Sequence, residues 1–168
     1  MSRSSPHTTL RHFCDSENRK TSITNPLGKI WQYTYDANGN VLTAKDPLNK
    51  TWTYTYNGNN DVLSVTDPLS KVTTFAYTSG NLTSVTDPLS HATSFAYDSY
   101  GNRTSVTNAL SKTWTYAYDS KGRVTSVTDP LSDATSFTYN NANLLLTATD
   151  NLSHVTTYAY DKGCPPPL

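Results

Sequence analysis

Charge, apolar side chains and cysteine are all scarce in this chain of 168 residues. Asp, Glu, Lys and Arg make up 15% of the residues, and apolar side chains make up 35%. Even with the seven glycines added, the apolar share stays below the roughly 45–50% of globular domains. This shortage disfavours a helical globule and favours thin β structure with much solvated surface.

The charges that are present give no basic face. The formal net charge is zero, and no run of Lys and Arg is longer than two residues. Proteins that capture nucleic acid need a cluster of positive charge. We therefore expect no nucleic-acid partner.

The two cysteines, Cys14 and Cys164, lie near opposite ends of the chain. A disulfide framework would need more cysteines at closer spacing, so two unpaired thiols are expected. Residues 1–24 contain no apolar run of signal-peptide length, and no segment is long enough for a transmembrane helix. We expect no membrane span, and a cytoplasmic location if the chain is expressed alone.

A repeat of about 21 residues fills most of the chain, and a period in this range is typical of array architectures. Units begin at residues 25, 46, 67, 87, 108, 129 and 150, and the unit at 67–86 is one residue shorter. The upstream residues 14–24 align with residues 97–107. The expected organisation is a disordered N-terminus at 1–10, a repeat array at 11–163 and a non-repeat tail at 164–168.

The first half of each unit has the pattern of a half-buried strand. In residues 50–56, Trp52, Tyr54 and Tyr56 alternate with threonines, and period two with β-branched and aromatic residues predicts a strand. The same phase recurs along the chain and predicts an aromatic ladder on one face of the sheet. Its members are Trp31, Tyr33, Tyr35, Trp52, Tyr54, Tyr56, Phe75, Tyr77, Phe95, Tyr97, Trp114, Tyr116, Tyr118, Phe137, Tyr139, Tyr158 and Tyr160.

A turn follows this first strand. Asp36 and Gly39 stand where a type I turn starts and where a left-handed residue closes it. Only Gly and Asn, which enter positive φ most cheaply, occur at this closing position. The predicted turn positions are Gly39, Asn60, Gly80, Gly101, Gly122 and Asn143.

The second strand of each unit leads into an Asp-Pro-Leu turn. Asp at the first position and Pro at the second favour a type I turn, as at Asp67 and Pro68. A leucine recurs in every copy of this turn, and we expect it to tuck under the sheet edge. The repeat thus predicts an all-β fold of tandem hairpins in one antiparallel, twisted, coiling sheet, with roughly 13–14 strands from the six full units and one partial unit.

In the typical unit an aromatic residue precedes a Tyr-Asp pair, and a Gly/Asn turn, a Thr-rich strand and Asp-Pro-Leu follow. This repeat unit resembles the YD repeat of Rhs proteins. Tyr35-Asp36, Tyr97-Asp98, Tyr118-Asp119 and Tyr160-Asp161 carry the Tyr-Asp pair, and Asn57, Thr78 and Asn140 replace its Asp elsewhere. That family includes bacterial Rhs and wall-associated polymorphic toxins, Tc toxin shells and animal teneurins. The resemblance covers residues 11–163.

The resemblance implies a β-sheet that spirals into a hollow shell around a C-terminal toxin. It also implies an extracellular or cell-surface location for the intact protein. Full shells contain many more repeats, and the family's core-ending segment and toxin domain have no counterpart here. The resemblance therefore implies a slice of shell wall whose partners are the rest of a longer shell or its toxin cargo.

Two interpretations of the aromatic ladder remain open. The first is cross-strand packing that stabilises the sheet, and the second is a surface on which sugars or peptides stack. The D-x-N-x-N spacing from Asp36 to Asn40 resembles half of a calcium loop, but ordinary turn chemistry explains it. His91 and His154 occupy a slot that elsewhere holds Lys or Asp, which indicates a solvated turn flank. No metal or cofactor is expected.

No nucleophile motif or phosphate loop occurs, and nearly every polar residue has counterparts in other units. We therefore expect a non-enzymatic structural segment of an Rhs/YD-repeat protein. The alternative is a surface adhesin or carbohydrate-binding array that uses the aromatic ladder. Because the strands at both ends should expose unpaired backbone, edge-strand self-association is also expected.

Overall fold

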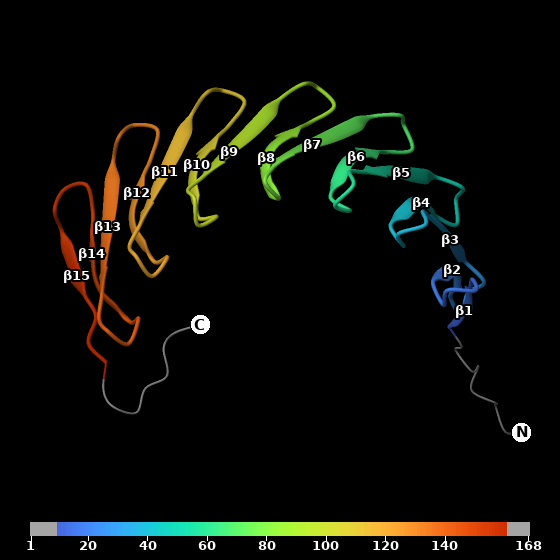
Figure 1. Cartoon of the computed structure of the whole chain (residues 1–168), viewed down its shortest axis with the longest axis horizontal. Coiled ribbons are helices and arrows are strands. Elements are labelled where there is room, and N and C mark those ends of the chain that lie inside the picture. Colours follow the sequence, from blue (N-terminus) through green and yellow to red (C-terminus); the bar gives the residue numbers. More distant parts are fainter. Residues whose placement is uncertain (1–9, 161–168) are drawn as a thin grey trace, which may run out of the picture. The chain divides into compact units, whose positions relative to one another are not determined.

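The computed structural model describes residues 10–160, and this part of the chain contains fifteen strands and no helix. The strand order in the sheet follows the chain order from β1 to β15, so the sheet is open and short turns join its neighbours (Figure 1). This confirms the predicted all-β fold of tandem hairpins. The strands are β1 (Arg11–Cys14), β2 (Lys20–Thr24), β3 (Ile30–Tyr35), β4 (Val41–Lys45), β5 (Thr51–Tyr56), β6 (Val62–Thr66), β7 (Val72–Thr78), β8 (Asn81–Thr86), β9 (Ala92–Tyr97), β10 (Arg103–Thr107), β11 (Thr113–Tyr118), β12 (Val124–Thr128), β13 (Ala134–Tyr139), β14 (Leu145–Thr149) and β15 (Val155–Thr157).

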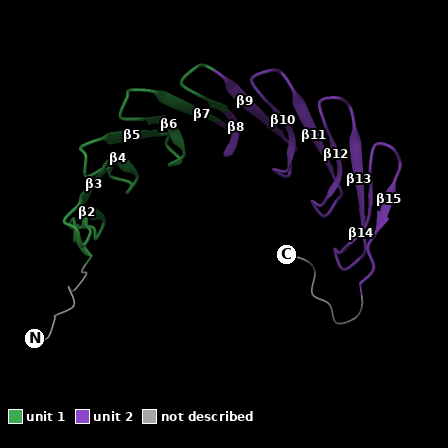
Figure 2. Ribbon diagram, turned by 180° about the vertical axis from the view of Figure 1, so that it is seen from behind, with its two compact units in different colours: residues 1–76, 85–90 green, residues 77–84, 91–168 purple. Residues whose placement is uncertain are grey.

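The chain divides into two compact units, which are coloured separately in Figure 2. Unit 1 comprises Met1–Ala76 and Val85–Ser90, and unit 2 comprises Tyr77–Ser84 and His91–Leu168. Residues 1–9 and 161–168 lie outside the described part of the chain. The expectations of a disordered N-terminus, of a tail at 164–168 and of an unpaired Cys164 fall wholly or mostly on those residues. Cys14, in β1, is a free and exposed thiol.

Neither unit has a hydrophobic core. Within residues 10–160 no side chain, apolar or polar, is buried. Domains ordinarily bury a sheet face against a second layer of structure, but here each hairpin contacts only its neighbours along the sheet. Backbone ladders, turns and cross-strand side-chain pairs therefore hold the strands together, which is consistent with the low apolar content.

The two faces of the sheet differ in chemistry. On one face, aromatic residues of the odd-numbered strands lie opposite small aliphatic residues of the even-numbered strands. Ala44, for example, pairs with Tyr33 on one side and with Trp52 on the other. The opposite face carries hydroxyl pairs such as Thr34 with Thr43, 2.7 Å apart. Alternating large and small residues lets the aromatic rings cover their neighbours without a second layer.

A β-bulge recurs near the start of the second strand of a hairpin. Tyr35 pairs with Val41 while Thr34 pairs with Thr43, so Leu42 is an extra residue. The same register shift occurs in the β1–β2, β5–β6, β9–β10, β11–β12 and β13–β14 hairpins. Bulges increase local twist and interrupt the backbone ladder. The period-two pattern did not predict them, because one inserted residue is hidden within a short strand.

The last strand is shorter than its sequence pattern predicts. β15 ends at Thr157, so the ladder residues Tyr158 and Tyr160 lie beyond it. The Tyr158 amide still donates to the Leu146 carbonyl at 2.9 Å. The hairpin ladder therefore continues by one bond past the assigned strand.

Candidate functional site

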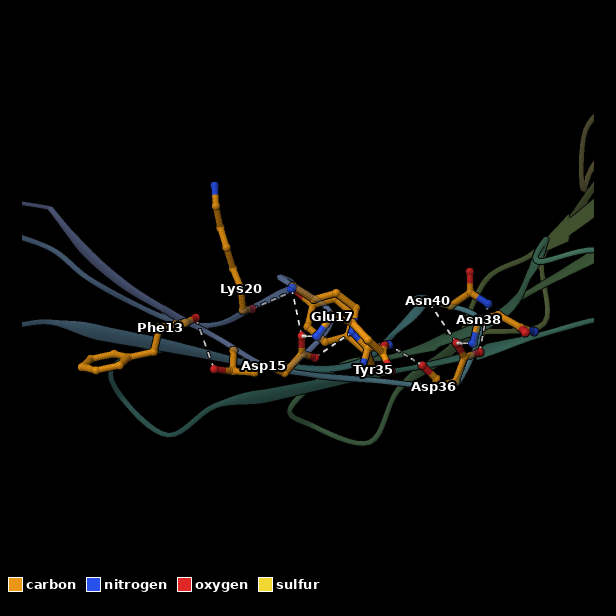
Figure 3. A network of polar contacts seen from close by, with 10 residues as sticks. Phe13, Asp15, Glu17, Lys20, Tyr35, Asp36, Asn38 and Asn40 are labelled. Carbon is orange, nitrogen blue, oxygen red and sulfur yellow. Dashed lines mark hydrogen bonds and ion pairs between the residues drawn. The ribbon is translucent and has the colours of Figure 1, made fainter.

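The turns that follow the odd-numbered strands from β1 to β13, except the short turn after β7, share one geometry, and we call them the YD turns. In the turn from Asp36 to Asn40, the Asp36 amide donates to the Asn40 carbonyl at 2.9 Å, and the Gly39 amide donates to the Asp36 carbonyl at 3.2 Å. One Asp36 carboxylate oxygen, Oδ1, accepts from the amides of Asn38 and Asn40, both at 2.9 Å (Figure 3). The YD turns begin at Asp15, Asp36, Asn57, Asp98, Asp119 and Asn140.

This geometry explains the pattern of replacements for Asp. The bonds need only a side-chain carbonyl or carboxylate oxygen, and Oδ1 of Asn57 accepts from Asn59 and Asp61 in the same way at 2.9 Å. Thr78 replaces Asp only where the turn is short. There Ser79 and Gly80 both have positive φ, 51° and 80°, which is the pattern of a two-residue type I′ hairpin that needs no side-chain cap.

The six positions predicted for left-handed residues all have positive φ: Gly39 at 88°, Asn60 at 67°, Gly80 at 80°, Gly101 at 85°, Gly122 at 76° and Asn143 at 65°. These are the values that the restriction to Gly and Asn suggests. The positions close turns, so their role in this structure is conformational.

The turns that follow the even-numbered strands, which we call the DPL turns, have the same geometry. Asp46 Oδ1 accepts from the amides of Leu48 at 2.8 Å and Lys50 at 2.9 Å. The fourth residue again has positive φ, here 63° at Asn49. The equivalent residues are Gly28, Ser70, Ser90, Ser111, Ser132 and Ser153, with φ between 59° and 72°. An ordinary type I turn was expected, and the left-handed fourth residue was missed because serine rarely adopts that conformation.

The leucine of the DPL turn does not tuck under the sheet edge, so that prediction is wrong. The exposed fraction is 69–83% for the seven turn leucines, which are Leu27, Leu48, Leu69, Leu89, Leu110, Leu131 and Leu152. The physical reason is that the third turn residue contributes its amide to the Asx bond, as Leu69 does to Asp67 at 2.8 Å. Its side chain then points away from the turn and finds no second layer to cover it.

Tyrosine hydroxyls join consecutive repeats. Tyr56 donates to the Val41 carbonyl at 2.9 Å, fifteen positions earlier in the chain. Val41 lies at the bulge of β4, beyond the residues that pair with β5, so its carbonyl has no partner in that ladder. Equivalent bonds run from Tyr35 to Lys20, from Tyr118 to Arg103 and from Tyr139 to Val124, at 2.8–2.9 Å. The tyrosine of the Tyr-Asp pair thus satisfies a carbonyl that the bulge frees.

Two arginines reinforce these joints. Arg19 forms an ion pair with Asp15 at 2.7 Å and donates to the carbonyl of Asp36 at 2.8 Å, and its guanidinium lies 5.1 Å from the ring centre of Tyr35. Figure 3 shows the network around Asp15, Tyr35 and Asp36. Arg123 repeats the arrangement over Tyr139 at 4.7 Å and donates to the carbonyl of Asn140 at 3.0 Å. Each arginine therefore links its own YD turn to the next one.

The remaining ladder residues line the aromatic face. All aromatic ladder residues except Tyr158 are half-buried, and each lies beside neighbours of its own face. Desolvation by these neighbours raises the pKa of Tyr35 and of Tyr56. A stacking surface would need ring faces open to solvent. The most open aromatic is instead Tyr100, 90% exposed, which is not part of the ladder.

Tyr100 stands at the third position of a YD turn and is a singular departure from the repeat. It borders a depression of about 570 Å³ that is also lined by Asp98, Asn102, Tyr116 and Lys121. The sequence pattern did not predict Tyr100 as a site residue, because the aromatic ladder lies on the strands and Tyr100 lies in a turn. The signal was the lone aromatic among Asn38, Asn59, Lys121 and Ala142 at equivalent positions.

The described part of the chain presents neither a set of side chains that could bind a metal ion nor a helix that could span a membrane. Residues 10–160 contain no group of three or more His, Cys, Asp and Glu side chains placed to hold a metal ion. Within the same residues no helix has the length and apolarity to cross a membrane. Asp36 and Asn40, considered above as half of a calcium loop, bond to each other at 2.9 Å.

The turn carboxylates couple the fold to pH. The pKa of Asp36 and of Asp98 lies below the usual value, chiefly because the side-chain amides of Asn40 and Asn102 donate to them. For Asp119 the chief cause is the side-chain bond from Arg123. For Asp15 and Asp150 it is the backbone amide of the residue four positions later.

We expect acid to destabilise the array. A carboxyl group with a lowered folded-state pKa contributes stability above its unfolded pKa of about 3.9, and that contribution is lost as the pH falls through the folded value. The thermal midpoint should therefore fall steadily below about pH 4. Circular dichroism melts between neutral and strongly acidic pH measure this change.

A triple variant supplies the control for this acid effect. It combines Asp36→Asn, Asp98→Asn and Asp119→Asn. Each substitution removes the titrating carboxyl group but keeps a side-chain oxygen that accepts the turn's hydrogen bonds. Asn57 and Asn140 accept the same bonds in the natural sequence. The acid loss should be smaller in this variant. An unchanged pH profile would contradict a role for these carboxylates.

The chain matches the family model described as RHS Repeat in five overlapping stretches, at residues 15–51, 35–68, 78–113, 97–134 and 118–152. None of the curated proteins compared with the chain matches its sequence.

Among solved structures, the chain resembles part of the Photorhabdus luminescens Tc holotoxin pore with a substitution in TccC3. The identity is 16%, the TM-score is 0.71, and the match covers 89% of this chain and 9% of that one. It also resembles the TcdB2–TccC3–Cdc42 crystal structure at 16% identity and a TM-score of 0.70, covering 85% and 9% of the two chains. TcdB2–TccC3 without its hypervariable C-terminal region gives 16% identity and a TM-score of 0.70, covering 89% and 10%. The chain therefore spans about a tenth of the length of these similar chains.

Proposed function

Since the chain belongs to the RHS-repeat family, we propose that it is a non-enzymatic structural segment that forms part of a β-shell wall. The observation that carries the proposal is the absence of a core. A sheet with no buried residue between 10 and 160 is unusual for a free domain, since domains bury one face against a second layer. It is expected of a wall that is completed by further repeats.

The mechanism of such a wall is passive. Each strand is held by its neighbours, and each turn except the short one at Thr78 is closed by its own Asp or Asn. Tyrosine hydroxyls join one repeat to the next, as Tyr139 joins Val124 at 2.8 Å. Stability in such arrays is a sum of repeat and nearest-neighbour contributions. A wall built in this way can be lengthened by adding repeats without redesigning any contact.

The partners of this wall are the remainder of a longer shell and the toxin cargo of such a shell. The similar solved chains are about ten times as long as the matched segment. They include a Tc holotoxin pore and a TcdB2–TccC3 structure without its hypervariable C-terminal region. For the intact protein that contains this segment, the proposal includes encapsulation of a toxin and a location outside the cell or at its surface.

A carbohydrate-binding array is the second candidate, and one observation favours it. Tyr100 exposes its ring at a turn tip, beside a depression that Tyr116, Asp98 and Lys121 also line. Sugars bind aromatic faces flanked by polar groups. The ladder itself fits this function less well, because its rings are half-buried and four of its hydroxyls are bonded to backbone carbonyls.

Co-purification separates the two functions. Tagged chain should retain a longer RHS-repeat shell fragment on a column in high salt, because a wall segment pairs through backbone and apolar contacts that salt does not screen. A glycan array probed with the same preparation should give no signal above that of Tyr100→Ala. Binding of a glycan that Tyr100→Ala abolishes, without retention of shell fragment, would overturn the proposal in favour of the second candidate.

A further inference from the structure

The chain contains two Asn-Gly steps, Asn38-Gly39 and Asn57-Gly58. Asparagine is a thermolabile residue, because the next backbone nitrogen can attack its side-chain carbon. Glycine in the next position favours this attack, since it has no Cβ to obstruct the approach. Both steps lie in YD turns of unit 1, so the same dipeptide occurs in two settings within one compact unit.

The carboxamide of Asn57 is held by three hydrogen bonds. Asn57 is the first residue of its turn, and its Oδ1 accepts from the amides of Asn59 and Asp61, both at 2.9 Å. Its Nδ2 donates to the Asp61 carboxylate at 3.0 Å. Rotation of the carboxamide toward the Gly58 nitrogen breaks all three bonds, each of which resists the reaction. The structure therefore protects Asn57.

The carboxamide of Asn38 has no such restraint. Asn38 is the third residue of its turn and is exposed, and within residues 10–160 its side chain makes no hydrogen bond. The bond that opposes attack is the one from the Gly39 amide to the Asp36 carbonyl, at 3.2 Å. Equivalent bonds in the other YD and DPL turns are 2.9–3.1 Å long. One backbone bond thus opposes reaction at Asn38, against three side-chain bonds at Asn57.

We propose that Asn38 is a modification site, at which the folded chain deamidates spontaneously and forms isoaspartate. The Gly39 nitrogen attacks Cγ of Asn38 and a Cγ–N bond forms, while Nδ2 leaves as ammonia with the proton that the Gly39 nitrogen loses. Water then opens the cyclic imide. Addition of water at Cγ breaks the new bond and yields aspartate. Addition at the backbone carbonyl breaks the original peptide bond and yields isoaspartate, whose main chain runs through Cβ and Cγ.

The turn that contains Asn38 is joined to the YD turns on both sides of it. Arg19 donates to the Asp36 carbonyl at 2.8 Å, and the Asn40 side chain donates to Oδ1 of Asn60 at 2.8 Å. Isoaspartate lengthens the main chain between Asp36 and Asn40 by one carbon, so the bonds that close this turn lose their geometry. Deamidation therefore loosens the link between three consecutive turns, an effect that goes beyond the passive wall function.

Peptide mass spectrometry of the full chain, kept folded at mildly alkaline pH, tests the proposal. It follows the replacement of NH2 by OH at both asparagines. Asn38 should convert about tenfold faster than Asn57 or more, because two more hydrogen bonds restrain Asn57. In urea the two rates should converge, since the dipeptides are identical. Asp61→Ala, which removes the acceptor of Asn57 Nδ2, should accelerate Asn57 alone. Labelling with a methyltransferase specific for isoaspartate identifies that product.

Thermal melts of the incubated samples test the structural consequence. The melting temperature of wild-type chain should fall with incubation time. Asn38→Lys, which places at this position the residue found at Lys121 in an equivalent turn, should keep its melting temperature. Asn57→Asp removes the other Asn-Gly step and keeps the oxygen acceptor, so it should age like wild type.

Three results would overturn the proposal. They are equal rates at Asn38 and Asn57 in the folded chain, a rate ratio that stays the same in urea, and no isoaspartate at position 38. Loss of stability on ageing that is as large in Asn38→Lys as in wild type would contradict the structural consequence.

Discussion

Removing four tyrosine hydroxyls should destabilise the array by about 2–4 kcal/mol in total, at about 0.5–1 kcal/mol for each partly solvated hydrogen bond. The variant replaces Tyr35, Tyr56, Tyr118 and Tyr139 with Phe, so that the rings stay and the bonds to Lys20, Val41, Arg103 and Val124 are lost. This is a large effect for a fold without a core, since whole domains are stable by only about 5–15 kcal/mol. Urea unfolding followed by tryptophan fluorescence measures it.

The strands themselves contain the matched control for this prediction. Tyr33, Tyr54 and Tyr116 lie two residues earlier on the same face of the same strands. Their side chains make no hydrogen bond within residues 10–160. Changing these three to Phe should cost much less per site, because no carbonyl loses its partner. Equal losses per site in the two series would show that the rings, and not the hydroxyls, join the repeats.

Replacing the five left-handed DPL-turn serines with glycine should stabilise the array by about 2–3 kcal/mol. Ser70, Ser90, Ser111, Ser132 and Ser153 have φ between 59° and 72°. An L-residue in this conformation costs about 1–2 kcal/mol, whereas glycine costs about 0.5–1 kcal/mol of extra chain entropy. The net gain is about 0.5 kcal/mol per site, and Gly28 already occupies this position at 72° in the first full unit.

Strand serines give the opposite sign and serve as the control. Ser94 and Ser136 lie within β9 and β13, where glycine costs entropy without relieving any strain, so each should lose about 0.5–1 kcal/mol on change to Gly. Thermal melts of both series report the sign directly. Destabilisation by the turn substitutions would mean that the serines hold their conformation without strain.

The fold was predictable from the sequence because each level of the repeat agrees with the others. Alternation at Trp52, Tyr54 and Tyr56 specifies a strand, and the Gly/Asn restriction at Gly39 specifies the turn that reverses it. Repetition then turns one hairpin into an array. The thirteen strands from β3 to β15 match the count expected for the units that begin at residue 25.

The contacts between repeats were not predictable in the same way. The bulge at Leu42 cannot be recognised in the sequence of a five-residue strand, and without this bulge the Val41 carbonyl would not be available to the Tyr56 hydroxyl. Burial was also misjudged for the turn leucines, because apolar residues are ordinarily assigned to the inside of a globular domain. That assumption fails for a single-layered sheet in which no side chain between residues 10 and 160 is buried.

The central claim is tested most directly by the size of the native assembly that contains these repeats, measured in the producing cells. Native extract is separated by size and probed with an antibody against the chain. A wall segment should elute in an assembly roughly ten times the chain's 18.5 kDa or larger, since similar chains are about ten times longer than the matched stretch. An assembly of one or two copies alone, with no other RHS-repeat polypeptide, would contradict the claim that the chain functions as part of a longer shell wall.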